Sequence, residues 1–363
     1  MRAMQPRQVW DVFCRVIDNH GDVGVAWRLC ADLASRGQVL RLWLDDTAAL
    51  DWMAPDGLRG VEVVAWTDPP PDLAPGDVVV ETFGCDPPQR FVQRMAERAS
   101  PPAWVNLEYL SAEAYVQRNH GLPSPIILPD GRMLTKRFFY PGFTAGTGGL
   151  LREPGLLAAR QAFDRDAWLR GHGLAAQPGE RLVSLFCYDN PALAGLLDLL
   201  ADLPTLLLVT PGVPAAQVSA LLGPTLQRAA LRARLLPYST QQGYDHLLWA
   251  CDLNFVRGED SFVRAQWAGT PFVWQIYPQH GGAHAAKLHA FLDRMLAGAG
   301  GGGETATAAS LRALSLGLNG LATLPDEFPA PAPWRAACQR WRDELLAQVD
   351  LSTQLIEFLG KTR

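Results

Sequence analysis

The sequence lacks paired cysteines, long apolar runs and an excess of positive charge. Its six cysteines are scattered over 363 residues with no C-x-x-C pair, which predicts reduced thiols buried in the protein core. No uncharged stretch approaches the ~20 residues of a membrane span, and no apolar signal segment precedes the first strand-like run. The formal net charge of −5 offers no basic surface to nucleic acid but tolerates a cationic partner. We therefore expect a cytoplasmic protein and, because a chain of this design usually needs no second copy, a monomer.

Several motifs of well-known enzyme classes are also missing. The turn after the first predicted strand has no G-x-G-x-x-G fingerprint, which disfavours an NAD-dependent oxidoreductase, and the chain has no P-loop or G-x-S-x-G turn. His280 and His284 are spaced like metal ligands, but two glycines lie between them and no cysteine or carboxylate cluster completes a site. We expect no metal ion and no cofactor.

The chain does contain short apolar, strand-like runs that alternate with helical patterns, which is typical of parallel βα units. One series of predicted strands covers 8–17, 39–46, 61–68, 77–83 and 103–110, and a second covers 181–188, 205–212, 233–238, 252–256 and 270–274. A helix is expected over 25–37, where an apolar stripe ends at a glycine. The segment 132–155 is rich in glycine, proline and aromatic residues, and it indicates a hinge between the two series.

This organisation predicts an α/β protein with two Rossmann-like domains. The GT-B arrangement, in which two such domains face each other across a cleft, is the leading candidate, although dehydrogenases and periplasmic-type binding proteins share the pattern. We expect an acceptor-side domain over 1–165 and a nucleotide-sugar-binding domain over 166–330. Residues 331–363 predict one or two helices that pack near the domain junction.

The turn after the first predicted strand is acidic. Asp18 and Asp22 stand where a dinucleotide-binding fold would have glycines, and two carboxylates there would repel a pyrophosphate and attract a cation. Both together, at the edge where clefts of open α/β sheets form, favour a functional site, and we predict that Asn19, Gly21 and Gly24 contact the substrate. For each aspartate alone a structural role remains open, because Asp22 is a good helix N-cap and Asp18 a good turn residue.

In the second series, the polar loop Arg257-Gly258-Glu259-Asp260-Ser261 follows a buried strand and leads into a helix expected over 262–268. Free amide groups and the helix dipole make such a helix start an anion site, so Asp260 and Ser261 are predicted to cradle a diphosphate. Glu259 would instead bind sugar or ribose hydroxyls. The alternative that Asp260 and Ser261 only cap the helix stays open.

Aromatic and amide side chains follow other strands of the second series. Tyr238 and Gln241 are suited to stack on and read a pyrimidine base, while Phe186 and Tyr188 line the same edge if the sheet is parallel. Packing at the rim or in the core is the structural alternative for these aromatic residues.

Taken together, these stretches resemble the elongation factor P arginine rhamnosyltransferases, the EarP family. The resemblance covers nearly the whole chain, and it rests on VIDNHGDVGVAWRL (16–29), WVNLEYLSAEAYV (104–116), FCYDN (186–190), RGEDS (257–261) and AHAAKL (283–288), among others. It implies an inverting GT-B transferase that works without metal and moves rhamnose from TDP-β-L-rhamnose to one arginine of elongation factor P. A nucleotide-sugar epimerase and a non-catalytic nucleotide-sugar-binding protein are the alternatives.

The resemblance also implies roles for individual residues. Asp18, Asp22 and Glu259 fall on positions needed for activity, and we assign Asp22 as the base and Asp18 as the residue that orients the guanidinium group. The TDP contacts fall on Phe186, Tyr188, Gln241, Asp260 and Ser261. Two positions depart from the family pattern, because Tyr238 stands where relatives commonly carry phenylalanine and His20 where a more apolar aromatic residue is expected.

Overall fold

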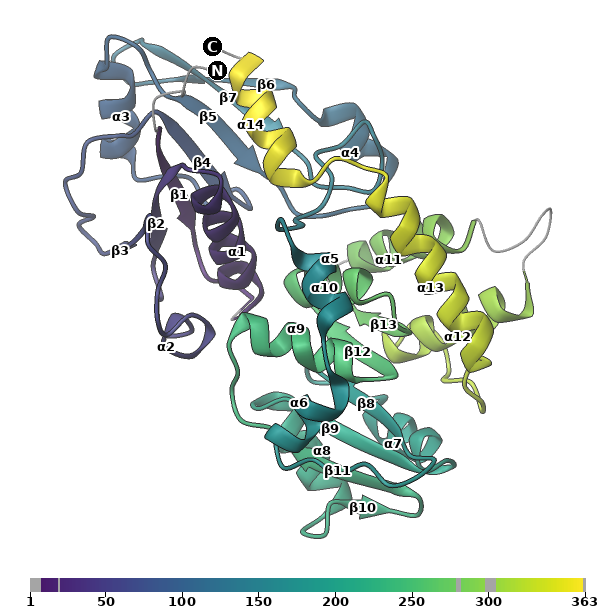
Figure 1. The fold of residues 1–363 in the computed structure, drawn as a ribbon. Coiled ribbons are helices and arrows are strands. Elements are labelled where there is room, and N and C mark those ends of the chain that lie inside the picture. The colour runs from purple at the N-terminus through teal and green to yellow at the C-terminus, as the bar shows by residue number, and fades with distance from the viewer. Residues whose placement is uncertain (1–7, 19, 279–281, 298–304, 362–363) are drawn as a thin grey trace. The chain divides into compact units, whose positions relative to one another are not determined.

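The computed structural model describes residues 8–18, 20–278, 282–297 and 305–361 (Figure 1). The chain divides into two compact units, of which the first comprises 1–154 with 348–363 and the second 155–347. Each unit has its own sheet with helices packed on it, which confirms the expected pair of Rossmann-like α/β units.

The first unit is built on a seven-stranded sheet in the order β3-β2-β1-β4-β5-β7-β6, and only the β6–β7 pair is antiparallel. Its strands are β1 (Val9–Cys14), β2 (Val39–Leu44), β3 (Val61–Ala65), β4 (Val78–Thr82), β5 (Ala103–Leu107), β6 (Pro123–Ile127) and β7 (Met133–Phe139). Its helices are α1 (Gly21–Ser35), α2 (Leu50–Met53), α3 (Gln89–Glu97), α4 (Ala114–Asn119) and α14 (Leu351–Lys361).

Two apolar clusters cover the two faces of this sheet. One joins α1 and α14 to β1, β2 and β4 through residues such as Leu29, Leu33 and Leu355, and the other packs α3 against the opposite face around Phe13 and Trp43. Side chains alternate between the two faces along each strand, so a fully buried strand reads as a continuous apolar run, as at Val78–Val80.

The second unit contains a six-stranded sheet in the order β10-β11-β9-β8-β12-β13, and again one edge pair, β10–β11, is antiparallel. The strands are β8 (Arg181–Leu185), β9 (Thr205–Val209), β10 (Gln227–Arg228), β11 (Leu231–Leu235), β12 (Leu253–Arg257) and β13 (Phe272–Gln275). The helices are α5 (Leu156–Ala162), α6 (Arg165–Gly171), α7 (Leu193–Ala201), α8 (Val213–Leu222), α9 (Gln241–Ala250), α10 (Asp260–Ala268), α11 (Ala283–Leu296), α12 (Ala306–Leu318) and α13 (Pro331–Leu346).

The unit boundaries differ from the domains expected from the sequence. The first unit ends at residue 154 rather than 165, because α5 and α6 pack within the second unit. The segment 331–363 does form two helices, but they belong to different units. Trp341 of α13 donates a hydrogen bond to Gln266 in the second unit (2.8 Å), whereas Arg36 of the first unit binds Asp350 just before α14 (2.8 Å).

Part of the predicted hinge is a strand. β7 lies inside 132–155, and it pairs with β5 in parallel and with β6 in antiparallel orientation. The strand β6 contains proline at positions 123 and 125, and for this reason the sequence pattern does not predict a strand there. The structure tolerates both because β6 is an edge strand, where an amide hydrogen is not needed on the outer side.

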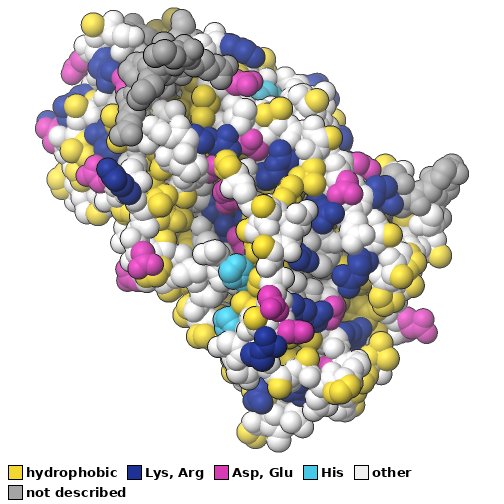
Figure 2. Space-filling view, in the orientation of Figure 1, with side chains coloured by type: hydrophobic (Ala, Val, Ile, Leu, Met, Phe, Trp, Pro, Cys, Tyr) yellow, Lys and Arg dark blue, Asp and Glu magenta, His cyan; other side chains and the backbone are white. Residues whose placement is uncertain are grey.

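None of the helices in the described part of the chain combines the length and apolar character that a bilayer-spanning segment requires. Charged side chains of both signs are interspersed on the visible face of the protein (Figure 2), in agreement with a composition that has no excess of positive charge.

An ion pair lies inside the first unit. The fully buried Glu81 of β4 accepts hydrogen bonds from Lys136 Nζ (2.5 Å) and from Trp104 Nε1 (3.2 Å), and Lys136 Nζ also lies 3.4 Å from Asp86. Burial raises the pKa of Glu81 to about 6, although the hydrogen bond and the charge of Lys136 act to lower it.

Replacing Lys136 with methionine is expected to destabilise the protein by about 3 kcal/mol at pH 8, because it leaves the Glu81 carboxylate buried without its cation. Without Lys136 the pKa of Glu81 rises further, so the folded state binds a proton that the unfolded state releases above its ordinary pKa of 4.5. The loss of stability should therefore be smaller at pH 5. Urea unfolding at both pH values measures it, with Lys136→Met/Glu81→Gln as the control. An equal loss at both pH values would contradict this account.

Candidate active site

The candidate residues of the first unit lie where the strand order of the sheet reverses. The chain runs from β1 to β2 on one side and later crosses to β4 on the other, so β1 and β4 flank the switch point. Ligands of open α/β sheets bind at the carboxyl ends of the strands at such a point. Asp18 and Asp22 follow the carboxyl end of β1.

Asp22 is held rigidly. It lies in the first turn of α1, it is 3% exposed, and its Oδ2 accepts the backbone N–H groups of Ile17 (2.9 Å) and Asp18 (2.8 Å). Burial raises the pKa of its carboxyl, the two amide hydrogen bonds oppose this, and the charges of Asp18 and Asp45 add to the rise. A buried carboxyl of raised pKa is a stronger base than an exposed aspartate.

The N-cap alternative for Asp22 is wrong in detail. α1 begins at Gly21, four residues earlier than expected, and His20 occupies the N-cap position without a side-chain capping bond. Asp22 instead closes the turn from inside the helix, so it has a structural role together with the proposed chemical one. His20 packs edge-on against Trp52, with ring centroids 5.1 Å apart.

Asp18 is half-buried, and its position depends on Gly21. The Gly21 amide donates to the Asp18 carbonyl, and a Cβ built on Gly21 would lie 2.6 Å from Asp18 Oδ2. Glycine is therefore required for close approach of the Asp18 carboxylate, although its backbone angles suit any residue. Gly24 lies within α1 and is buried, and Asn19 lies outside the described residues.

A third carboxylate, which the sequence analysis did not predict as a site residue, lies at the same edge of the sheet. Asp45 follows β2, the strand next to β1, and its Oδ1 accepts the N–H of Val16 (2.9 Å). Its place at the end of the strand predicted over 39–46 was the available signal, because the carboxyl ends of neighbouring parallel strands share one edge.

An aromatic pair lies across the switch point, on the β4 and β5 side. Phe83, the first residue after β4, has a positive φ of 58°, and its ring stacks on Tyr109 at 4.4 Å. Such a backbone conformation is strained for phenylalanine and is typical of functional turns. Glu108, next to Tyr109, accepts a hydrogen bond from Asn106 (2.7 Å), and burial raises its pKa. No local sequence signal marks Phe83.

In the second unit the reversal of strand order lies between β8 and β12. The loop from Arg257 to Ser261 follows β12. It is shorter than expected, since Arg257 ends the strand and α10 already begins at Asp260, with Gly258 at a φ of 58° making the turn. Glu259 occupies the N-cap position and its side chain makes no capping hydrogen bond.

The hydroxyl of Ser261 shapes this loop. It accepts the Arg257 N–H at 3.0 Å and donates to the Arg257 carbonyl oxygen. The N-cap position of α10 is occupied by Glu259 and not by Asp260 or Ser261. The first turn of α10 faces the carboxyl edge of the sheet, as an anion site at a helix start requires.

Arg257 links the loop to the end of β8. Its guanidinium carbon lies 4.4 Å from the ring centroids of both Phe186 and Tyr188, and its Nη1 donates to the Cys187 carbonyl (3.2 Å). The side chain is 7% exposed. Stacking on two aromatic rings thus places a fixed positive charge beside the start of α10.

Glu259 is paired with a lysine that the sequence reading did not assign. Lys287 of α11 approaches Glu259 Oε1 at 3.0 Å, and each side chain is 15% exposed. The stretch AHAAKL, which contributed to the family resemblance, contains this lysine.

Tyr238 and Gln241 lie away from this loop. They follow β11, three strands from β12, with Tyr238 50% exposed and Gln241 opening α9 behind the Thr240 cap. The structure thus spreads the candidate residues of this unit along one sheet edge, in two groups at its β8–β12 and β11 positions.

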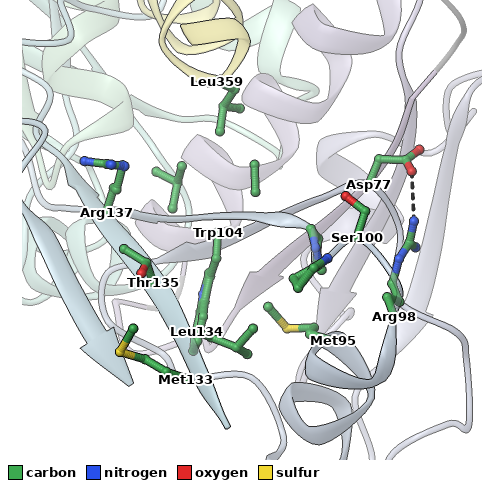
Figure 3. A pocket seen from close by; sticks show the side chains of 14 residues that line it. Asp77, Met95, Arg98, Ser100, Trp104, Met133, Leu134, Thr135, Arg137 and Leu359 are labelled. Atoms are coloured by element: carbon green, nitrogen blue, oxygen red, sulfur yellow. Dashed lines mark hydrogen bonds and ion pairs between the residues drawn. The ribbon is translucent and has the colours of Figure 1, made fainter. Parts of the chain in front are cut away.

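One pocket of the first unit lies away from these residues. It has a volume of about 560 Å³ and opens at the amino-terminal edge of the first sheet, beside the starts of β5 and β7 (Figure 3). Trp104 and Leu134 line it, and Arg98 on its rim is tied to Asp77 at 3.1 Å. This is the opposite edge from Asp18 and Asp22, so the pocket is no part of the candidate site.

Within the described part of the chain no three His, Cys, Asp or Glu side chains gather in a way that could hold a metal ion. His280 lies outside the described residues.

With this geometry in view, the chain can be compared with known proteins. A family model described as "Elongation-Factor P (EF-P) rhamnosyltransferase EarP" matches residues 10–360. The chain belongs to the EarP family. It is an enzyme of the glycosyltransferase class.

Curated EarP family relatives are similar over almost their full length. The chain is 45% identical to a protein-arginine rhamnosyltransferase of Pseudomonas aeruginosa, with 96% of this chain and 98% of the relative covered. It is 43% identical to the one of Pseudomonas putida (97% and 98% covered) and 35% identical to one of Neisseria meningitidis (96% of each). These relatives place the chain among the protein-arginine rhamnosyltransferases.

A solved EarP structure matches as well. The one described as the structural basis for EarP-mediated arginine glycosylation of translation elongation factor EF-P is 33% identical, with a TM-score of 0.66 over 98% of this chain and 100% of that one. The glycotransferase of kitacinnamycin reaches a TM-score of 0.52 at 14% identity, with 98% and 100% covered, and shows the fold alone. These neighbours confirm the α/β, GT-B fold class.

For this EarP family member, we expect Gly21→Ala to lower transfer about 10- to 100-fold, because the new methyl group displaces the Asp18 carboxylate. Stability should be unchanged or up to ~1 kcal/mol higher, since alanine favours the helix. Steady-state kinetics and thermal unfolding measure the two effects.

The control for this prediction is the Asp18→Ala background, in which the atom that clashes is gone. There Gly21→Ala should cost nothing further. An equal loss in both backgrounds would show that Gly21 acts in another way.

Proposed function

We propose that this enzyme transfers L-rhamnose from TDP-β-L-rhamnose to an arginine side chain of elongation factor P, with inversion at the anomeric carbon and without a metal ion. The observation that carries the proposal is the opposite charge at the two switch points. Asp18 and Asp22 suit a cationic acceptor, and the start of α10 with Arg257 suits an anionic donor. Family membership supports rhamnose as the sugar, protein arginine as the acceptor group and elongation factor P as the acceptor protein.

On the donor side, the amides of Asp260 and Ser261 at the start of α10 are assigned to the diphosphate. The base of TDP is assigned to Tyr238 and Gln241 after β11, three strand spacings or about 14 Å away along the sheet edge. Phe186 and Tyr188, after β8, lie between these two positions. Glu259 is assigned to the hydroxyls of the sugar, to which a carboxylate makes strong hydrogen bonds.

The acceptor chemistry requires a late proton transfer. A guanidinium has a pKa of roughly 13 and an ordinary aspartate one of about 4, so removal of the proton before reaction would cost about 12 kcal/mol. Once the nitrogen bonds to the anomeric carbon, its acidity rises steeply and a carboxylate in place can take the proton. Because the pKa of Asp22 is raised, the difference between the pKa of the guanidinium and that of the carboxyl is smaller than for an ordinary aspartate.

In the proposed step a guanidinium nitrogen forms a bond to the anomeric carbon while the bond from that carbon to the diphosphate oxygen breaks. Asp22 accepts the proton from the nitrogen, and TDP leaves as the anion. Asp18 holds the planar guanidinium fork by paired hydrogen bonds. Inversion follows when the nitrogen attacks the face opposite the departing diphosphate.

The direct test is mass spectrometry of elongation factor P after incubation with the enzyme and TDP-β-L-rhamnose. The acceptor should gain the mass of one deoxyhexose, on an arginine. Turnover of the donor without any acceptor would favour an epimerase. Binding of TDP with no mass change on elongation factor P would favour a non-catalytic binding protein.

Asp22→Asn should lower transfer by about 10²- to 10⁴-fold, the usual contribution of a general base, with TDP affinity unchanged. Its amide oxygen can still accept the two N–H groups that Asp22 binds. Because burial raises the pKa of Asp22, the ionised carboxylate costs stability above that pKa, and the variant should be at least as stable as the wild type at pH 8.

The stability difference should shrink as the pH falls and Asp22 takes up its proton. Kinetics, TDP titration calorimetry and urea unfolding measure these three properties. Loss of TDP binding in Asp22→Asn would move this residue to the donor site and overturn its assignment as the base.

A further inference from the structure

Lys287 and Glu259 form a partly buried ion pair at the donor edge of the second unit. α11 follows β13, and β13 pairs with β12, so the first turns of α11 lie beside the start of α10. From there Lys287 Nζ reaches Glu259 Oε1 at 3.0 Å, with each side chain 15% exposed. Because both side chains are largely buried, solvent and salt screen this ion pair less than a pair on the protein surface.

The position of Glu259 poses an electrostatic problem. It is the residue directly before α10, where the helix start attracts the diphosphate, and a carboxylate within about 6 Å of a phosphate weakens its binding tenfold to a hundredfold in a medium of intermediate dielectric. The cation Arg257 is held by Phe186 and Tyr188 on the β8 side of the loop. A further positive charge next to Glu259 itself offsets this repulsion.

We propose that Lys287 is a positioning residue for the donor: its ammonium group fixes the carboxylate of Glu259 and offsets its charge, so that a carboxylate can serve the sugar beside a diphosphate. This inference rests on the proposed function of the same site. Lysine suits the role because its compact charge on a flexible stem can neutralise one carboxylate oxygen without the planar fork of arginine.

Calorimetric titration with TDP, which has the diphosphate but no rhamnose, separates these effects when the wild type, the two single variants and the double variant are compared. Lys287→Met should weaken TDP binding on the order of tenfold, because Glu259 then repels the diphosphate. Glu259→Gln should bind TDP as well as the wild type or better. The double variant Lys287→Met/Glu259→Gln should bind TDP like the wild type, since the pair then carries no net charge in either protein.

Kinetics give a second readout. Lys287→Met should raise the KM for TDP-rhamnose and also lower kcat, because an unfixed Glu259 orients the sugar less well, whereas Lys287→Arg should recover most of the TDP affinity by restoring the charge. Arg294→Met is the matched control, because it removes an exposed positive charge from the last turn of the same helix and should change neither property.

Two outcomes would overturn the proposal. Weak TDP binding in the double variant would show that Lys287 contacts the diphosphate directly, and normal binding in Lys287→Met would show an ordinary surface pair. Thermal unfolding checks the fold, and Lys287→Gln replaces the methionine variant if that one does not fold. The wild type is measured first, because failure to bind TDP or to modify elongation factor P refutes the proposed function, not the role of Lys287.

Discussion

The parallel direction of the strands is the constraint on which the site depends. In both sheets the central strands run the same way, so the turns after β1, β2 and β4 share one edge of the first sheet, and those after β8, β11 and β12 share one edge of the second. The backbone hydrogen bonds between the strands determine which strand ends lie at this edge, independently of the side chains. Polar residues that are far apart in the sequence are thereby brought to a common edge within each unit.

Charge then gives each edge its character. In the first unit the carboxylates of Asp18, Asp22 and Asp45 gather at neighbouring strand ends, and burial keeps Asp22 more basic than an exposed aspartate. In the second unit a helix start and the stacked Arg257 provide positive potential, and Glu259 is tolerated there beside Lys287. For the chemistry proposed, backbone amides and fixed side-chain charges are suited to stabilise the charges of donor and acceptor.

Local patterns predicted most of the secondary structure and failed at identifiable places. The apolar runs of β1, β4, β8, β9 and β12 were visible because strands buried on both faces contain little but apolar residues. Sequence patterns do not reveal the strands β6 and β7, since prolines and aromatic residues indicate a loop unless the strand is known to lie at an edge. α1 begins four residues before the helix predicted over 25–37, because Asp22 and Gly24 resemble turn residues in the sequence.

The sequence by itself determined the α/β class, the two Rossmann-like units and the positions of the acidic turn and of the loop for which anion binding is proposed, because these follow from periodicity and residue type within short stretches. Only the tertiary structure decided which residues meet. It places α14 in the first unit and pairs Lys287 with Glu259. It also places the Arg257 guanidinium over the rings of Phe186 and Tyr188 and gives Phe83 a strained backbone conformation. Such contacts join residues tens to hundreds of positions apart, and they depend on how helices pack on a sheet, which no local pattern encodes.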